Sequence, residues 1–360
     1  MIRSRLLNHF GFVTVLLLLL SLCSACKKPQ PGPPLFAKPA LIGADLSLIP
    51  EVRNSQSTWY NKQGAAEDML QTLLHAGANL VRFRLWHKPA AGANMQEVQS
   101  LCAELRSLGM KSLISVHYSD TWADPAHQSK PEAWKALNLR QLEDSVYAYT
   151  RTILQSLQPD YIQIGNEINA GLLWPEGSYT DTANMFSLIR AGINAVRTLR
   201  KETKIVLHLA MTESMEYNLE QLRSLDYDII GLSYYPMWHG KDLNVIKSRL
   251  QSVVKQFRKP VFLVETSYPF TLGWNDNTHN IVGLSEQLLP QFPATPQGQK
   301  DYLWAIRNMM LSVEGGLGFC YWGGEWTAYK SSNATDGSPW ENQALWDFRG
   351  YALPAMEAFW

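Results

Sequence analysis

From residue 41 onward, short apolar runs rich in β-branched residues alternate with helix-like stretches. This alternation is typical of βαβ units, in which helices connect parallel strands. Eight runs follow the pattern, at residues 41–45, 79–86, 111–118, 161–167, 204–210, 229–235, 260–266 and 316–322. Eight parallel strands are the number that closes a (β/α)8 barrel. We therefore predict an α/β protein with a single TIM barrel over residues 41–360.

The stretches between the runs carry signals for helix ends. Residues 67–75 form one helix-like stretch, and Thr295-Pro296 supplies an N-cap followed by proline at the first helical position. That second helix should end before Gly315-Gly316. An open doubly wound sheet is the alternative architecture. No glycine-rich phosphate loop follows the first run, and eight runs favour closure.

Alternation along the second run indicates which side chains enter the barrel. Val81, Phe83 and Leu85 share one face and should contact the helices, so Arg82 and Arg84 should point inward. Buried arginines are costly unless carboxylates meet them. By the same argument Asp45, Glu167 and Glu265 point into the barrel, so that the interior charges are matched.

Two glutamates lie where strands end, the place where barrels of this kind carry their active sites. Glu167 follows Asn166 at the end of the fourth run, and Glu265 ends the seventh run, across the barrel mouth. Retaining glycosidases need two carboxyls about 5–5.5 Å apart, an acid/base and a nucleophile. Arg82 is the expected partner of Glu265, which would keep that group ionised. A buried ion network without catalysis is the alternative interpretation.

Several segments together resemble one known family. They are GADLS (43–47), RFRLW (82–86), HYSDTWADP (117–125), QIGNEINAGLLWPEG (163–177), SYYPMWHG (233–240), VETSYPFTL (264–272) and TPQGQ (295–299). In this order they resemble endo-β-1,4-galactanases of glycoside hydrolase family 53. The resemblance implies a retaining barrel enzyme with Glu167 as acid/base and Glu265 as nucleophile.

The resemblance also implies the sugar-binding residues. Asn166 would bind the substrate 2-hydroxyl, Arg82 and Tyr235 would contact Glu265, and Trp322 would form the floor beneath the cleaved sugar. The expected set of further substrate contacts is Arg84, Trp86, His117, Asp120, Trp122, Asp124, Trp174, Tyr234 and Trp238. Rim packing is the alternative for any one of the tryptophans, whereas as a set they indicate an extended sugar groove.

Two segments depart from the family pattern. Relatives usually continue the eighth strand with Glu-Pro, whereas here Trp322 is followed by Gly323-Gly324-Glu325. Some bacterial relatives bind calcium after the seventh strand through Asp, His and Asn. The matching loop offers Asp276, Asn277 and His279, short of the two carboxylates that a tight site prefers. A solvated loop is therefore the preferred interpretation, with no cofactor required and structural calcium as the alternative.

The first forty residues indicate export. A basic start and an apolar stretch with its centre at 16–20 are typical of a signal peptide over 1–25. Cys26 then stands where a bacterial lipobox acylates its cysteine, and residues 26–40 form a proline-rich tether. We expect a membrane-anchored lipoprotein at the bacterial cell surface or in the periplasm. Contact with the membrane would be through the anchor alone.

Composition narrows the partners. The chain has 32 basic and 32 acidic residues, a pI of about 7.1 and 13 tryptophans. This balance indicates a neutral polysaccharide substrate and no nucleic acid. We also expect a monomer. Cys102 and Cys320 are expected to be buried thiols. The alternatives to a galactanase are a related barrel glycosidase acting on mannan or xylan, and an inactive barrel that binds glycans at the cell surface.

Overall fold

The structure is a computed structural model that describes residues 40–55, 57–90 and 92–360. The expected signal peptide 1–25, the acylation site Cys26 and the tether as far as residue 39 lie outside these residues. Among the residues described, no helix is both long enough and apolar enough to cross a membrane.

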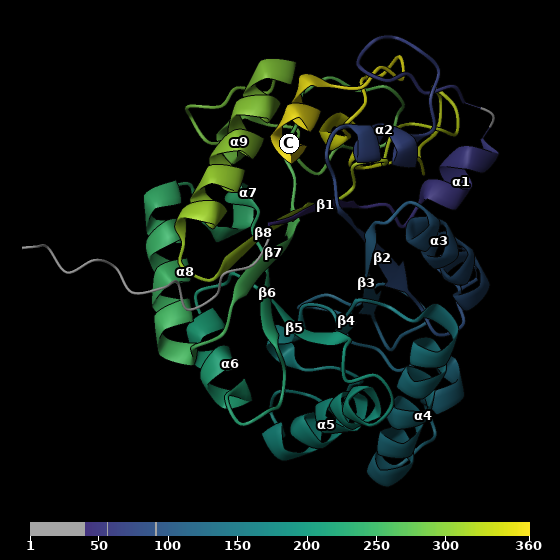
Figure 1. Ribbon diagram of the computed structural model, residues 1–360, viewed down its shortest axis with the longest axis vertical. Helices are drawn as coiled ribbons and strands as arrows, with labels where there is room; N and C mark the ends of the chain where they lie inside the picture. The colour runs from purple at the N-terminus through teal and green to yellow at the C-terminus, as the bar shows by residue number, and fades with distance from the viewer. Residues whose placement is uncertain (1–39, 56, 91) are drawn as a thin grey trace, which may run out of the picture. The chain divides into compact units, whose positions relative to one another are not determined.

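Eight parallel strands close into a barrel in chain order, each hydrogen-bonded to the next and β8 to β1 (Figure 1). This confirms the predicted (β/α)8 barrel and excludes the open sheet. The strands are β1 (Leu41–Asp45), β2 (Leu80–Leu85), β3 (Lys111–Val116), β4 (Tyr161–Ile164), β5 (Lys204–Ala210), β6 (Ile229–Ser233), β7 (Val261–Thr266) and β8 (Gly316–Tyr321).

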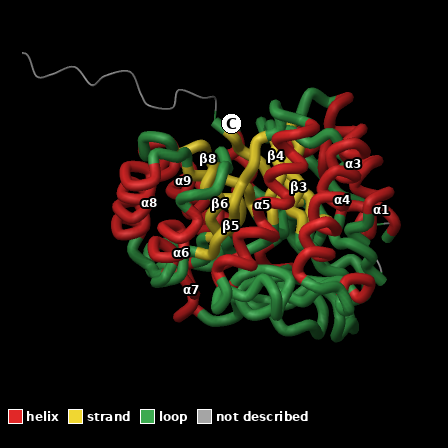
Figure 2. Tube along the Cα trace, turned by 90° about the horizontal axis from the view of Figure 1, so that it is seen from below, coloured by secondary structure: helices red, strands yellow, loops and turns green. Residues whose placement is uncertain are grey.

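Helices surround the barrel, and the long loops gather at one end of it (Figures 1 and 2). The helices are α1 (Ile49–Asn54), α2 (Met69–His75), α3 (Met95–Ser107), α4 (Leu139–Leu157), α5 (Thr182–Leu199), α6 (Met215–Leu222), α7 (Pro236–His239), α8 (Leu243–Phe257) and α9 (Pro296–Ser312). Five short 3-10 turns lie in the described loops. As expected, Thr295 caps α9 by accepting a hydrogen bond from the backbone N–H of Gly298.

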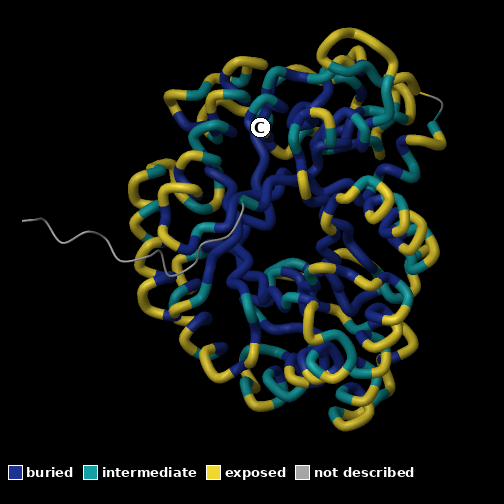
Figure 3. Tube along the Cα trace, viewed as in Figure 1, coloured by how far each residue is buried: buried dark blue, intermediate teal, exposed yellow. Residues whose placement is uncertain are grey.

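Two apolar layers stabilise the barrel, and Figure 3 shows the strands as its buried centre. Outward side chains such as Val81, Phe83 and Leu85 pack against the helices. A smaller cluster, including Leu80, Val206 and Val264, fills the interior. Gly231 is required there, because a Cβ at this position would lie 2.6 Å from Val206 Cγ1. Polar residues lie beyond these apolar layers, at the end of the barrel where the strands terminate.

Candidate active site

A cavity of about 860 Å³ opens where the strands end. This volume lies within the range of about 300–1,000 Å³ that ligand sites occupy. Both predicted catalytic residues, Glu167 and Glu265, line it. So do nine of the thirteen expected substrate contacts: Arg82, Arg84, His117, Trp122, Asp124, Asn166, Tyr235, Trp238 and Trp322.

A left-handed turn brings Glu167 to the cavity. β4 ends at Ile164, three residues earlier than expected, and the backbone then turns with φ +84° at Gly165 and φ +45° at Glu167. Because of this turn both Asn166 and Glu167 face the cavity, although strict alternation would direct one of them away. A left-handed glutamate is strained, and such strain concentrates at functional sites.

A bulge brings in Glu265. Phe262 and Val264 both belong to the interior cluster, so simple alternation would direct Glu265 toward the helices. The register between β6 and β7 shifts at this point, so that Leu232 pairs with Leu263 but Ser233 pairs with Glu265. Bulges re-aim side chains in this way next to active sites. The predicted inward position of Glu265 is therefore correct, but the bulge produces it rather than the alternation.

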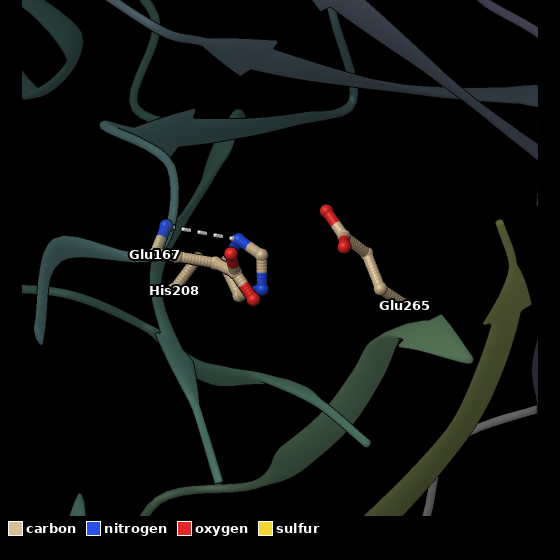
Figure 4. A group of neighbouring side chains, drawn as sticks. All are labelled: Glu167, His208 and Glu265. Atoms are coloured by element: carbon tan, nitrogen blue, oxygen red, sulfur yellow. Dashed lines mark hydrogen bonds between the residues drawn. The ribbon is translucent and has the colours of Figure 1, made fainter. Parts of the chain in front are cut away.

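The two glutamates face each other across the cavity (Figure 4). One carboxylate oxygen of Glu167 lies within 4.8 Å of one of Glu265. Inverting glycosidases separate their carboxyls by about 6.5–9.5 Å to hold a water, whereas retaining enzymes keep them at about 5–5.5 Å. The spacing therefore suits direct attack by one carboxylate.

Arg82 is the centre of a buried polar network. Its Nη2 lies 2.8 Å from Glu265 Oε1 and donates to Asn166 Oδ1 at 2.8 Å. Its Nη1 donates to Asp45 Oδ2 at 2.6 Å, and its Nε donates to Gln163 Oε1 at 2.8 Å. The second oxygen of Glu265 accepts a hydrogen bond of 2.9 Å from Tyr235 Oη. Both expected partners of Glu265 are therefore in contact with it.

These surroundings separate the two carboxyl groups chemically. Burial, and next the charge of Glu265, raise the pKa of Glu167 to about 8. Burial also raises the pKa of Glu265, but the Arg82 guanidinium and the Tyr235 hydroxyl stabilise its charged form. Glu265 is thus the first of the pair to lose its proton, and Glu167 keeps its own near neutral pH.

Aromatic rings enclose the cavity on the β8 side. Trp322 lies 4.7 Å from Trp326 and 4.5 Å from Trp340, and Trp122 lies 5.8 Å from Trp326, all measured between ring centroids. Trp238 extends from α7 at the rim and is 52% exposed. Indole faces of this kind suit the apolar faces of sugar rings.

Three further expected contacts lie on the β2 and β3 side. The Arg84 guanidinium lies between the rings of Trp86 and Trp122, at 4.4 and 4.1 Å from their centroids. Trp86 lines a neighbouring cavity of about 230 Å³, which Arg84 shares. His117 Nδ1 accepts a hydrogen bond of 3.0 Å from the backbone N–H of Ala123. Burial, together with Arg84 and Arg82, lowers the pKa of His117 well below its ordinary value, so it is neutral.

Besides Trp86, three expected substrate contacts do not line the cavity. Tyr234 has the outward parity of β6, so it packs into the helix-side core and donates to Gly240 O. Trp174 donates from its indole Nε1 to Ala170 O. Asp120 accepts from the backbone N–H groups of Lys88 and Glu132, at 2.8 Å each. These three residues hold loops in place, and the structure does not bring them to the cavity.

Residues that sequence reasoning missed also shape the site. His208 on β5 and Ser233 at the end of β6 lie beside the glutamates, and each was a lone polar residue at an inward position of an apolar strand. Trp326 and Trp340 come from the segment after β8. No pattern in that segment indicated which of its aromatic residues turn back over the barrel.

The described residues bring one group of metal-ligating types together, Glu167, His208 and Glu265. Two of the three already have side-chain partners: Glu265 has Arg82, and His208 has Ser233. The guanidinium at Glu265 supplies the positive charge that a cation would bring. The donor set therefore does not fit a catalytic metal ion.

The expected calcium trio is not assembled by the loop after β7. Asn277 and His279 are exposed, whereas Asp276 is buried, which a solvated loop does not explain. Asp276 Oδ2 and Glu341 Oε2 are buried without hydrogen-bond partners among the described residues. The two residues are neighbours, because the backbone N–H groups of Asn275 and Asp276 both point to Glu341 Oε1. If a calcium ion binds this loop, these two carboxylates are therefore its candidate ligands in place of the predicted trio.

Both cysteines of the barrel, Cys102 and Cys320, are free and buried, as the sequence indicated. Burial raises the pKa of each thiol, so neither is poised as a nucleophile.

Comparison with known proteins agrees with this geometry. Residues 41–359 match the model of glycosyl hydrolase family 53. The arabinogalactan endo-β-1,4-galactanase of Cellvibrio japonicus is 35% identical over 89% of this chain and 90% of its own length. The endo-β-1,4-galactanase of Bacillus subtilis is 32% identical over 89% and 86%. The solved catalytic domain of family 53 from Ignisphaera aggregans superposes with a TM-score of 0.84 at 33% identity, over 92% of this chain and 98% of that one.

Proposed function

Since the chain belongs to glycosyl hydrolase family 53, we propose that it is a retaining endo-β-1,4-galactanase acting on galactan or type I arabinogalactan. The family and the relatives named above support the substrate. The neutral charge balance and the aromatic walls of the cavity suit an uncharged sugar chain.

In the first step, an oxygen of the ionised Glu265 attacks the anomeric carbon. The bond from that carbon to the glycosidic oxygen breaks, and the proton of Glu167 transfers to the departing oxygen. The sugar is then bound to Glu265 as an ester, and Glu167 is left as a carboxylate. Arg82 and Tyr235 hold the oxygens of Glu265 in place for this attack.

In the second step, a water oxygen attacks the same carbon and the ester bond to Glu265 breaks. The proton of that water returns to Glu167, which acts as base, so both residues regain their starting states. Two displacements at one carbon restore the original configuration. We expect Asn166, which is held by Arg82 and by Ala123 O, to bind the hydroxyl beside the reacting carbon.

The single observation that carries the mechanism is the distance below 4.8 Å between oxygens of Glu167 and Glu265, with Arg82 on the latter alone. The test is hydrolysis of linear β-1,4-galactan, followed by proton NMR of the first anomer formed. Release of the β-anomer supports the proposal. An initial α-anomer would refute the retaining mechanism.

Assays on the same protein sample distinguish two alternative functions. An inactive glycan-binding barrel would bind galactan without releasing reducing ends. A related specificity would release more sugar from mannan or xylan than from galactan. The buried pair of glutamates favours an enzyme over a glycan-binding protein. Burying two carboxyl groups that take no part in a reaction would only destabilise the folded protein.

We also propose export and acylation at Cys26, which rest on the first forty residues of the sequence alone. Replacement of Cys26 by alanine should move the protein from the membrane fraction to the soluble fraction of the producing bacterium. Galactan hydrolysis by the extracted protein should not change. Membrane retention of this variant would contradict the anchor.

A further inference from the structure

Ser233 stands at the end of β6 and contacts His208, whose ring nitrogen lies within 4.8 Å of a carboxylate oxygen of each glutamate. It is fully buried, and the β-bulge places it opposite Glu265 in the sheet register. Hydrogen bonding by its hydroxyl lowers the pKa of both Glu167 and Glu265. One hydroxyl is therefore within reach of both carboxyl groups, although it has one hydrogen to donate.

His208 determines where that hydrogen points. Gln163 Oε1 accepts from Arg82, so the Gln163 amide NH2 faces His208 Nδ1, at 3.0 Å. The backbone N–H of Glu167 points to the same nitrogen, at 3.4 Å (Figure 4). Because two donors converge on Nδ1, this nitrogen is the unprotonated one, and Nε2 carries the hydrogen.

Asn166 Oδ1 also lies 3.0 Å from His208 Nδ1. This oxygen already accepts from Arg82 Nη2 and from Ser115 Oγ, so it does not need a hydrogen from the ring. Burial and the nearby Arg82 and His117 lower the pKa of His208 well below its ordinary value, which keeps the ring neutral. The tautomer with hydrogen on Nε2 therefore satisfies every fixed donor around it.

The hydroxyl of Ser233 then has one open direction. His208 Nε2 lies 2.7 Å from Ser233 Oγ and donates to it. Since the oxygen accepts from the ring, its own hydrogen must point away, toward the two carboxyl groups. The ionisable groups around this point are Asp45 from β1, Arg82 from β2, His117 and Asp124 after β3, Glu167 after β4, Tyr235 after β6 and Glu265 from β7.

We propose that Ser233 is a positioning residue whose hydroxyl, oriented by His208, follows the negative charge from Glu265 to Glu167 between the two steps of the reaction. Before the first step the charge is on Glu265. Once that residue is esterified, the charge is on Glu167, and rotation about the Cβ–Oγ bond suffices to redirect the hydrogen. This inference rests on the proposed two-step function, and it assigns an additional residue to each step.

The test replaces Ser233 by alanine, which removes the oxygen and adds no volume. We expect kcat on galactan to fall about 10- to 100-fold, the size of one hydrogen bond to a charged group. Both limbs of the pH profile should move to higher pH, because the variant loses a donor that lowers the pKa of each carboxyl group. With an aryl β-galactobioside bearing a dinitrophenol leaving group, mass spectrometry should detect accumulated glycosyl-enzyme.

Ser115→Ala is the matched control. Ser115 is equally buried and contacts Arg82, Gln163 and Asn166, but it is not among the groups that shift the pKa of either glutamate. Its loss should leave both limbs of the pH profile in place, whatever it does to the rate. Equal shifts in the two serine variants would show a general loosening of the network and would overturn the proposal.

Two substitutions of His208 separate orientation from bulk. Asn retains an acceptor near the place of Nδ1 and loses the donor to Ser233, whereas Gln retains a donor near the place of Nε2. His208→Asn should therefore shift the pH profile as Ser233→Ala does, and His208→Gln should shift it less. Circular dichroism checks the fold of each variant, and Ser233→Ala decides the matter if a histidine variant is unfolded.

The two proposals fail in different ways. If the wild-type protein hydrolyses neither galactan nor the aryl glycoside, the proposed function is wrong. If the wild type is active and Ser233→Ala matches it in rate and in pH profile, the enzyme is retained and the role of Ser233 is refuted.

Discussion

Arg82 Nη2 lies 2.8 Å from Glu265 Oε1, and the other terminal nitrogen of this guanidinium donates to Asp45 Oδ2 at 2.6 Å. One buried cation thus links β1, β2 and β7 and holds the nucleophile at the same time. Burial lowers the pKa of Arg82, but the charges of Glu265 and Asp45 outweigh this effect and raise it, so it stays charged. Stability and chemistry depend here on one residue.

Arg82→Ala should lower the free energy of unfolding by about 3–5 kcal/mol, because it leaves Asp45 and Glu265 buried without a cation. Chemical denaturation measures this. Lys135→Ala is the control: its pair with Glu132 has side chains 61% and 78% exposed and should contribute less than about 1 kcal/mol. If both variants lose a similar free energy of unfolding, burial does not make the contacts of Arg82 more important than an exposed ion pair.

Glu167→Ala should reduce kcat/KM on galactan about 10²- to 10⁴-fold, because the leaving oxygen receives no proton. An aryl glycoside with a good leaving group should suffer much less in its first step. Added azide should restore turnover and yield the β-glycosyl azide. An α-azide would mean that Glu167 is the nucleophile and that the two assigned roles must be exchanged.

The pH dependence of kcat/KM should be bell-shaped. Activity requires Glu167 protonated, so it falls as the pH rises through the pKa of about 8. It also requires Glu265 ionised, so it falls as the pH drops through the pKa of that group. In Glu167→Gln the alkaline limb should disappear along with most of the activity. Persistence of that limb would assign it to another group.

Trp238→Ala should raise KM for galactan about 2- to 10-fold with kcat nearly unchanged, since one stacked ring contributes about 0.5–1.5 kcal/mol. The ring is 52% exposed at the cavity rim. Tyr217 on α6 is 61% exposed and does not line the cavity, so Tyr217→Ala is the control. If the two variants have the same KM, Trp238 does not contact the sugar.

Structural calcium, the alternative that the sequence leaves open for this loop, would stabilise the protein through Asp276 and Glu341, whose oxygens Oδ2 and Oε2 are buried without hydrogen-bond partners among the described residues. At about 100 times its Kd, a ligand that binds the folded state alone raises the free energy of unfolding by about 2.7 kcal/mol. Thermal melts with calcium and with a chelator measure the effect. Asp276→Asn should abolish the response, and Asp336→Asn, which removes an 80% exposed carboxylate paired with Lys330, should keep it. An unchanged melting temperature in wild type would show that hydrogen bonds alone hold this loop.

The sequence by itself determined the barrel and its main charges, because the relevant signals are local. Alternation of period two marks each strand, and the cap at Thr295 marks α9. Placing Val81 and Phe83 against the helices forces Arg82 inward, wherever the rest of the chain lies. Glu167 and Glu265 were recognisable because they stand where apolar strands end, which is where barrels of this kind carry their active sites.

Only the tertiary structure decided which atoms meet at the site, because these contacts depend on irregular backbone and on distant segments. The bulge that directs Glu265 inward and the left-handed turn at Glu167 break the period on which sequence reasoning relies. Tyr235 faces the cavity, whereas Tyr234, one residue earlier in the chain, faces the helix-side core. Trp340 reaches the cavity from more than fifteen residues beyond β8, about the longest loop that a compact domain usually allows. No local rule predicts where such a segment folds back.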